Sequence, residues 1–206
     1  MKSFINLILL FFTCVIFSQE KVLDTIEGKK QNLDEVIVES IRVKYSSPIS
    51  HSNISKAELK SRNLGQDLPV LLNFLPSIVT TSDAGGGIGY TGIRIRGVSA
   101  QSTNITINGI PFNDTESLGT YWVNLPDFAS SIESLQVQRG VGTSTNGSGA
   151  FGASINILTD AISVKPYAEI SNTIGSYNTL KHTIKFSTGE INNAFEFSGR
   201  FSKIDS

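Results

Sequence analysis

The sequence predicts an α+β protein in which short helices cover a small mixed β-sheet, followed by a region of longer antiparallel strands. Three observations support this class. Helix-start signals are clearest in residues 55–76, short strand patterns, most of them followed closely by glycine, lie within residues 93–158, and a longer alternation of apolar and polar residues begins after Val164. The 18 glycines favour turns and closely approaching backbones over long helices.

The N-terminus has the layout of a secretory signal peptide. Lys2 precedes an almost wholly apolar run over residues 4–17, and the small residue Ser18 is followed by polar residues. This run is shorter than the roughly 20 residues of a membrane-spanning helix, so we expect export and cleavage after Ser18. Cys14 would be removed with the signal, which leaves the mature chain without a disulfide or a thiolate metal site.

Residues 19–48 are predicted to form a flexible arm, because they are polar and follow neither the helical nor the strand period. The arm contains one run with the composition of a strand, namely Leu33, Asp34, Glu35, Val36, Ile37 and Val38. A strand in a mobile arm can pair with the exposed edge of a partner's sheet. Taken alone, the run is equally compatible with an ordinary first strand of the next domain.

The domain after the arm is predicted to begin with two short helices. Ser55 and Glu58 have the spacing of a capping box for a helix over residues 56–62. A second helix is expected to open at Asp67 and Pro69 and to end at Pro76. Both helices are expected to cover a small sheet.

The sheet is predicted from short segments in which apolar and polar residues alternate. Four strands are expected, over residues 93–96, 105–107, 132–139 and 155–158. Asn108 and Gly109 form a strong two-residue hairpin signal after the second of them. A brief helix is expected over residues 124–131.

Beyond Val164 the alternation is longer and more regular. Residues 180–187 and 195–202 each place mainly apolar side chains on one face and polar ones on the other, and residues 167–174 form a weaker first member. These lengths approach the roughly 9 to 11 residues of one strand across an outer membrane. A soluble antiparallel sheet would show the same alternation.

The composition argues against nucleic-acid and nucleotide binding. With 17 basic and 18 acidic residues the formal net charge is −1, which gives no general attraction to nucleic acid. Residues 147–152 satisfy the dinucleotide-binding pattern literally, but no strand directly precedes them and β-favouring residues follow where a helix should begin.

No enzymatic or metal site is predicted. His51 and His182 lie far apart, and neither has a second histidine at ligand spacing. Asn113, Asp114 and Glu116 lack the spacing of a calcium loop, so a surface turn is expected there. No convincing nucleophile elbow is present. We therefore expect neither an enzyme nor a cofactor.

Several segments, in order, resemble the signatures of one family, the TonB-dependent outer-membrane receptors, particularly those of the Bacteroidetes lineage. Residues 33–38 resemble the TonB box. The segments that resemble plug-domain signatures are residues 93–97, 106–111, 132–140 and 147–157. Residues 175–179 resemble a turn near the first barrel strands, so the resemblance runs from about Leu33 to the end.

The resemblance implies a domain organisation. Residues 49–160 would form a plug domain with a mixed sheet and short helices, and residues 161–206 would begin a transmembrane antiparallel β-barrel, which has 22 strands in this family. In that pattern Ser206 falls inside an early barrel strand. We therefore expect this sequence to be a truncated fragment that does not transport by itself.

The resemblance also implies a function. Such a receptor lies in the outer membrane and imports a scarce nutrient, and TonB, with its inner-membrane motor proteins, pulls on the box from the periplasm. A ferric siderophore or similar iron complex is the first expectation for the ligand, with cobalamin, oligosaccharides and peptides open. The alternative is a β-rich surface or periplasmic binding or adhesion protein without energy coupling.

Three groups of site residues follow. Leu33, Asp34, Glu35, Val36, Ile37 and Val38 would bind TonB. Arg94, Arg96 and Arg139 would suit ionic contacts between plug and barrel wall, the alternative being solvated strand charges. Tyr90, Tyr121 and Trp122, with the loops at residues 85–89 and 113–119, are candidates to face the ligand, the alternative being packing beneath the barrel.

Overall fold

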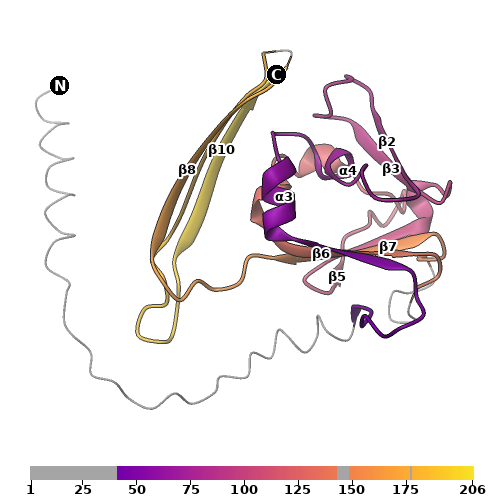
Figure 1. The fold of residues 1–206 in the computed structure, drawn as a ribbon, viewed down its shortest axis with the longest axis horizontal. Helices are drawn as coiled ribbons and strands as arrows, with labels where there is room; N and C mark the ends of the chain where they lie inside the picture. The colour runs from indigo at the N-terminus through magenta and orange to yellow at the C-terminus, as the bar shows by residue number, and fades with distance from the viewer. Residues whose placement is uncertain (1–40, 143–148, 177) are drawn as a thin grey trace, which may run out of the picture. The chain divides into compact units, whose positions relative to one another are not determined.

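The computed structural model describes residues 41–142, 149–176 and 178–206, which all belong to one compact unit, Leu33–Ser206 (Figure 1). The predicted signal peptide and the predicted TonB box at residues 33–38 lie outside the described residues. The described chain contains a five-stranded main sheet, a two-stranded hairpin and a three-stranded C-terminal sheet.

The main sheet has the strand order β1-β6-β7-β4-β5. Its strands are β1 (His51–Ser55), β4 (Thr103–Ile107), β5 (Ile110–Pro111), β6 (Ile132–Arg139) and β7 (Ala153–Thr159). The β1–β6 and β6–β7 pairs are antiparallel and the β4–β7 pair is parallel, which confirms the predicted mixed sheet. Asn108 and Gly109 both have positive φ, 51° and 83°, as a type I′ hairpin turn requires between β4 and β5.

The first helix, α3 (Lys56–Arg62), is confirmed with its capping box. The Ser55 side chain accepts a hydrogen bond from the Glu58 backbone N–H, and the Glu58 carboxylate accepts one from the Ser55 N–H at 2.9 Å. These bonds satisfy backbone donors that a helix start otherwise leaves unpaired.

The second helix is shorter than predicted. α4 covers only Leu68–Leu71, and the chain then continues in tighter turns whose backbone N–H groups bond three residues back, as from Leu75 to Leu72. The Asp67 side chain makes no cap bond and accepts instead from the Thr91 hydroxyl at 2.9 Å. The expected extension to Pro76 was therefore wrong, although Leu72 and Leu75 are still buried.

The single helix expected over residues 124–131 was also wrong. Two short 3₁₀ turns stand there, η2 (Trp122–Asn124) and η3 (Phe128–Ser131), and a third, η1 (Ala100–Ser102), precedes β4. Pro126 disfavours a helical conformation for the residue before it, and Asp127 adopts a left-handed conformation with φ 50°. The chain therefore breaks between the two turns.

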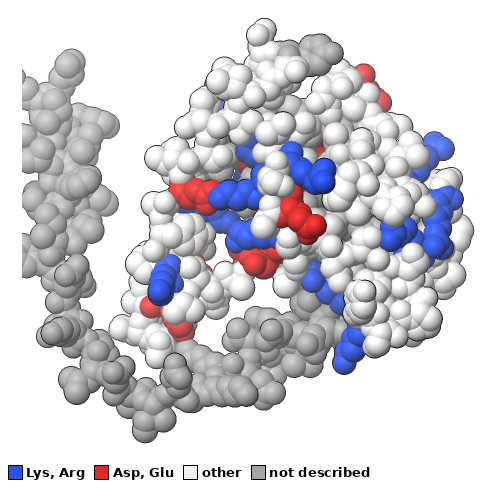
Figure 2. All heavy atoms as spheres, in the orientation of Figure 1, with Lys and Arg blue, Asp and Glu red and all other residues white. Residues whose placement is uncertain are grey.

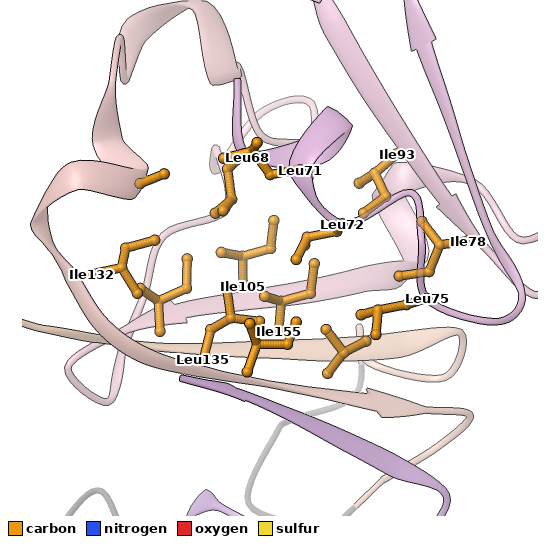
Figure 3. Close-up of a cluster of buried hydrophobic side chains, with 14 of the residues drawn as sticks. Leu68, Leu71, Leu72, Leu75, Ile78, Ile93, Ile105, Ile132, Leu135 and Ile155 are labelled. Carbon is orange, nitrogen blue, oxygen red and sulfur yellow. The ribbon is translucent and has the colours of Figure 1, made fainter. Parts of the chain in front are cut away.

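The hydrophobic core lies between the main sheet and the segments that cover it (Figure 3). Leu135 and Ile155 from the sheet are fully buried, as are Leu72 after α4 and Ile95 from the hairpin. The hairpin consists of β2 (Ile78–Ser82), which the sequence did not signal, and β3 (Thr91–Ile95). This arrangement confirms that short helices cover a small sheet.

The C-terminal sheet has the order β10-β9-β8, with both pairs antiparallel. β8 (Tyr167–Ile174) and β9 (Leu180–Ser187) coincide with their predicted ranges. β10 (Ser198–Asp205) begins later than the expected residue 195, because Ile191 and Phe195 pair across a turn in which Asn192 and Asn193 have positive φ. None of the described helices has the length and apolar character needed to cross a membrane.

Candidate functional site

The C-terminal sheet has an unusual distribution of side chains. Its polar face is buried against the part of the chain that precedes it, residues 41–160, which we call the N-terminal domain, and Lys181 and Thr183 are only 3% and 7% exposed. Its apolar face is open, with Ile174 and Phe201 83% and 70% exposed. A sheet folded in water does the reverse, because burial of apolar area drives its packing. The open face is therefore suited to apolar surroundings.

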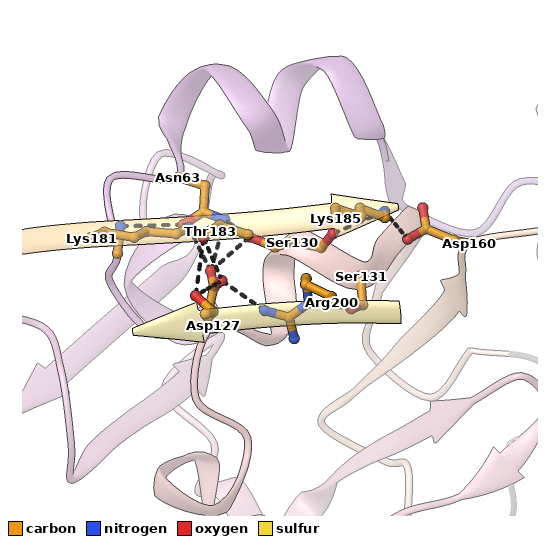
Figure 4. A network of polar contacts seen from close by, with 11 residues as sticks. Asn63, Asp127, Ser130, Ser131, Asp160, Lys181, Thr183, Lys185 and Arg200 are labelled. Carbon is orange, nitrogen blue, oxygen red and sulfur yellow. Dashed lines mark hydrogen bonds and ion pairs between the residues drawn. The ribbon is translucent and has the colours of Figure 1, made fainter. Parts of the chain in front are cut away.

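The buried contact between the C-terminal sheet and the N-terminal domain is centred on Asp127 (Figure 4). Its carboxylate accepts hydrogen bonds from Lys181 Nζ at 2.5 Å, from Arg200 Nη1 at 2.7 Å and from Ser202 Oγ at 2.6 Å. The Asp127 side chain is only 2% exposed. One carboxylate thus joins β9 and β10 to the N-terminal domain.

Local structure explains why the carboxylate points at the strands. The left-handed backbone of Asp127 begins η3, and the Ser130 hydroxyl in that turn donates to the carboxylate at 2.7 Å. Asn63, at the C-terminal end of α3, accepts from Lys181 Nζ at 3.0 Å and donates to Asp127 at 3.3 Å. We call Asn63, Asp127, Ser130, Lys181, Arg200 and Ser202 the Asp127 network.

A second carboxylate, Asp160, makes a more exposed contact of the same kind. It accepts from Lys56 Nζ at 2.5 Å and also from Lys185 of β9. Lys56 reaches Glu133 as well, at 2.9 Å. Figure 2 shows acidic and basic side chains intermixed in the middle of the view, where α3 lies in Figure 1.

The pKa of Asp127 reflects this environment. Burial by itself would raise the pKa, but the hydrogen bonds from Lys181, Ser202 and Ser130 and the charge of Lys181 outweigh it, so the pKa lies below its ordinary value of 3.8. The pKa of Asp160 is lowered in the same way, since Lys185 and Lys56 outweigh its burial. Both carboxylates therefore carry their charge at neutral pH.

These lowered pKa values predict an acid-sensitive contact. Each carboxylate binds a proton more weakly in the folded protein than in the unfolded chain, so its stabilisation is complete above pH 3.8 and is lost as the pH falls below that value. We expect the urea midpoint, followed by the fluorescence of the buried Trp122, to fall between about pH 4 and about pH 2. Asp127→Asn should reduce this fall, and an equal fall in that variant would contradict the assignment.

The contact borders a small, partly open pocket of about 100 Å³, lined in part by Lys60, Asn63, Lys181 and Glu169. This volume suits a few water molecules rather than an organic ligand. Within residues 41–142, 149–176 and 178–206, no three His, Cys, Asp or Glu side chains are placed to hold a metal ion.

The three arginines predicted to contact the barrel wall lie outside the Asp127 network. Arg139 donates to Ser52 Oγ at 2.7 Å and to the Pro76 carbonyl at 3.3 Å, while Arg94 and Arg96 are exposed at β3 and just after it. Burial, together with the nearby charge of Arg96, lowers the pKa of Arg139. Among the described residues none of the three forms an ion pair, and their contact with a barrel wall stays a prediction.

The three aromatic residues predicted to face the ligand differ in exposure. Tyr90 and Tyr121 are 68% and 51% exposed, whereas Trp122 is 3% exposed and belongs to the hydrophobic core. The position of Trp122 fits the packing alternative. A ligand-facing role remains a prediction for all three.

The loop at residues 113–119 is a well-bonded surface turn, as expected. Asn113 donates to the carbonyls of Thr103 and Leu118, both at 2.9 Å, and Asp114 accepts from the Ser117 backbone N–H at 2.7 Å. These bonds fix the turn against β4.

Sequence reasoning missed the Asp127 network. It placed Lys181 and Arg200 on polar strand faces, but gave them no partner, and it assigned no role to Asp127 or Asp160. No local signal could have found it, because lysines on a strand face are usually solvated and Asp127 lies 54 residues away from Lys181 in the chain.

Known proteins resemble this chain over most of its length. The family profile described as TonB-dependent Receptor Plug Domain matches residues 43–154. The vitamin B12 transporter BtuB of Vibrio vulnificus (strain YJ016) is 30% identical over 176 residues, which cover 84% of this chain and 28% of that protein. The probable TonB-dependent siderophore receptor PirA of Acinetobacter baumannii is 26% identical over 74% of this chain and 22% of its own length.

Solved structures show the same fold. The siderophore receptor PirA from Acinetobacter baumannii superposes with a TM-score of 0.56 at 22% identity, over 75% of this chain and 24% of that chain. P. aeruginosa FpvA, solved with heterologous pyoverdines, gives a TM-score of 0.62 at 18% identity, over 78% and 20%. The chain thus spans about a quarter of the length of the curated relatives it matches.

Proposed function

Because this chain belongs to the TonB-dependent receptor plug domain family, we propose that it is the plug and the first barrel strands of an outer-membrane receptor. The receptor would take up a scarce nutrient with energy supplied through TonB. The observation that carries this proposal is the reversed polarity of the C-terminal sheet, whose polar face packs on the plug domain and whose apolar face is open.

The reversed polarity supports a membrane position for β8, β9 and β10. Strands of a transmembrane barrel alternate between apolar residues that face lipid and polar residues that face the interior. An adhesion or binding protein folded in water would not leave Ile170 71% exposed while it buries Lys181. This comparison weighs against the alternative of a β-rich protein without energy coupling.

Energy coupling would act through the arm. In this proposal TonB pairs with the box at residues 33–38, and tension along the arm loosens the plug. The plug meets the C-terminal sheet through ion pairs and hydroxyl groups, as between Asp127 and Ser202 or Asp160 and Lys185. A polar contact of this kind exposes little apolar area when it opens, so local rearrangement does not require the core to unfold.

Arg94, Arg96 and Arg139 would supply further plug contacts in the complete receptor. Arg96 lies close enough to Arg139 to lower the pKa of that guanidinium, and neither has a carboxylate partner among the described residues. Two neighbouring cations favour an acidic partner. We place that partner on the barrel wall beyond Ser206.

For the ligand we propose a ferric siderophore or a similar iron complex, recognised in part by the exposed Tyr90 and Tyr121. Relatives named as siderophore receptors support this class. Cobalamin is the second candidate, because a vitamin B12 transporter is 30% identical over 84% of the chain.

Uptake by cells that carry the complete gene tests the proposal. Under iron limitation, with other uptake routes removed, we expect growth on a ferric siderophore that is lost when residues 33–38 are deleted. Growth that depends instead on added cobalamin would select the second candidate. Equal accumulation of every tested cargo by the complete and the deleted receptor would refute energy coupling.

A further inference from the structure

The face of the main sheet that points away from the hydrophobic core is polar and yet buried. Its polar side chains come from alternate positions of β6, β7 and β4, between the core positions. They are Gln136 and Gln138, 2% and 0% exposed, Ser154 and Asn156, 0% and 3% exposed, and Thr106, 4% exposed.

Three of these side chains and the exposed Asn53 of β1 form one row across the sheet. The pairing registers place Asn53 beside Gln136, Gln136 beside Asn156, and Asn156 beside Thr106. Within the row Gln136 Nε2 donates to Asn53 Oδ1, and Thr106 Oγ1 donates to Asn156 Oδ1, both at 2.7 Å. The bond to Asn53, with a second from Gln138 Nε2 to Gln136 Oε1 at 2.9 Å, holds the amide of Gln136 in a fixed orientation.

The row binds the start of the described chain. Gln136 Oε1 accepts from the Val43 backbone N–H at 2.7 Å, and Gln136 Nε2 donates to the Val43 carbonyl at 3.0 Å. Gln138 Nε2 donates to the Ile41 carbonyl at 3.1 Å. A single side chain therefore offers Val43 the donor and acceptor that a neighbouring strand would offer. Figure 1 shows this indigo segment on the side of the sheet away from α3 and α4.

Arg42 also binds the sheet, but this contact leaves two buried polar atoms without hydrogen-bond partners among the described residues. Its guanidinium donates to Ser134 Oγ at 2.9 Å, to the Ser134 carbonyl at 3.0 Å and to the Asn156 carbonyl at 3.1 Å. All three acceptors are neutral, and burial lowers the pKa of Arg42. Arg42 Nε and Asn156 Nδ2 are buried without a hydrogen-bond partner among the described residues. When the segment leaves the sheet, water can form hydrogen bonds with both atoms, which lowers the free-energy cost of opening.

We propose that Arg42, Gln136 and Gln138 form a releasable clasp, a binding site on the plug sheet for residues 41–43 of the same chain. The proposal rests on the proposed function, in which the TonB box lies just before this segment. While the clasp is closed, tension applied to the arm acts first on the contacts of residues 41–43, which lie before β1 in the chain. Opening frees residues 41–50, which can extend to a total length of about 35 Å at about 3.3–3.6 Å per residue.

The polar character of the site fits repeated release. Release exposes the Val43 side chain, which is only 6% exposed in the closed clasp, whereas the amides and the guanidinium that hold the segment are readily hydrated. Backbone recognition by Gln136 also places little demand on the side chain of the bound residue.

Hydrogen exchange of the Val43 amide in the purified chain, held in detergent micelles, tests the clasp. We expect slow exchange in the native chain and at least tenfold faster exchange in Arg42→Ala and in Gln136→Leu. Gln101→Leu, at an exposed glutamine of η1, is the matched control and should leave the rate unchanged.

Arg42→Ala decides the result if Gln136→Leu disturbs the sheet, because Arg42 lies outside the hydrophobic cluster. Unchanged exchange of Val43 in Arg42→Ala, or unprotected exchange in the native chain, overturns the clasp. Faster exchange at Val43 with unaltered β6 and β7 amides supports it.

Capture by the periplasmic part of TonB separates the clasp from the proposed function. Arg42→Ala should speed capture several-fold, and an unchanged rate would overturn the link between the clasp and arm reach. If Val36→Pro is captured as well as the native chain, TonB pairing through the box fails, while the exchange result for the clasp still stands.

Discussion

Replacement of Asp127 by asparagine is expected to detach the C-terminal sheet from the plug domain. The change removes the negative charge but keeps the shape, and asparagine tolerates the left-handed backbone at this position. Lys181, whose side chain is 4% exposed, would keep its charge without a carboxylate partner. Loss of one partner from a buried ion pair costs about 3–5 kcal/mol.

This loss should appear as faster hydrogen exchange in β9. A local cost of about 3 kcal/mol raises the population of the open state by more than about 100-fold. The amides of β6 and β7 should keep their protection, because the hydrophobic core does not include Asp127. Unchanged protection of β9 in Asp127→Asn would show that the carboxylate does not hold the two parts together.

The pair between Lys60 and Glu169 provides the matched control. It also joins α3 to β8, at 2.5 Å, but its side chains are 67% and 43% exposed. Exposed ion pairs contribute about 0–1 kcal/mol because water and salt screen them. Glu169→Gln should therefore leave β9 protection nearly unchanged.

A double variant tests whether the cost comes from the unpaired lysine. Lys181→Met removes the buried charge while retaining much of the side-chain volume. Added to Asp127→Asn, it should restore part of the β9 protection, although Arg200 still lacks its carboxylate. No recovery in the double variant would indicate that the cost arises elsewhere.

Local signals explain which elements the sequence could predict. The capping box at Ser55 and Glu58 and the alternation in residues 132–139 act through near neighbours, and both are confirmed. The lengths of α4 and of the segment around Asp127 depend on distant contacts. Asp67, for example, bonds Thr91 instead of capping α4, which no local pattern reveals.

In the candidate site, too, one part follows from a local pattern and the other depends on distant contacts. The alternation in residues 180–187 predicted a polar face on β9, and the structure has one. What that face contacts depends on Asp127, which lies 54 residues away from Lys181 in the chain. The sequence predicted a helix across Pro126 and Asp127, so the left-handed backbone of Asp127 and the contacts of its carboxylate required the packed structure.

The largest functional effect is expected from a proline in the predicted TonB box. Val36→Pro removes one backbone N–H and fixes φ, so a strand centred on this residue should no longer pair with the edge of a TonB sheet. In a pull-down with the periplasmic part of TonB we expect capture of the chain to fall to background.

The control is a proline elsewhere in the arm. Thr25→Pro has the same chemistry but lies before the box, so capture should match that of the native chain. Equal capture of Val36→Pro and Thr25→Pro would remove the box from the mechanism. Loss of capture in both would instead show that the whole arm, rather than residues 33–38, is recognised. Only selective loss supports force transmission through one strand, because edge pairing depends on the backbone donors of the paired residues themselves.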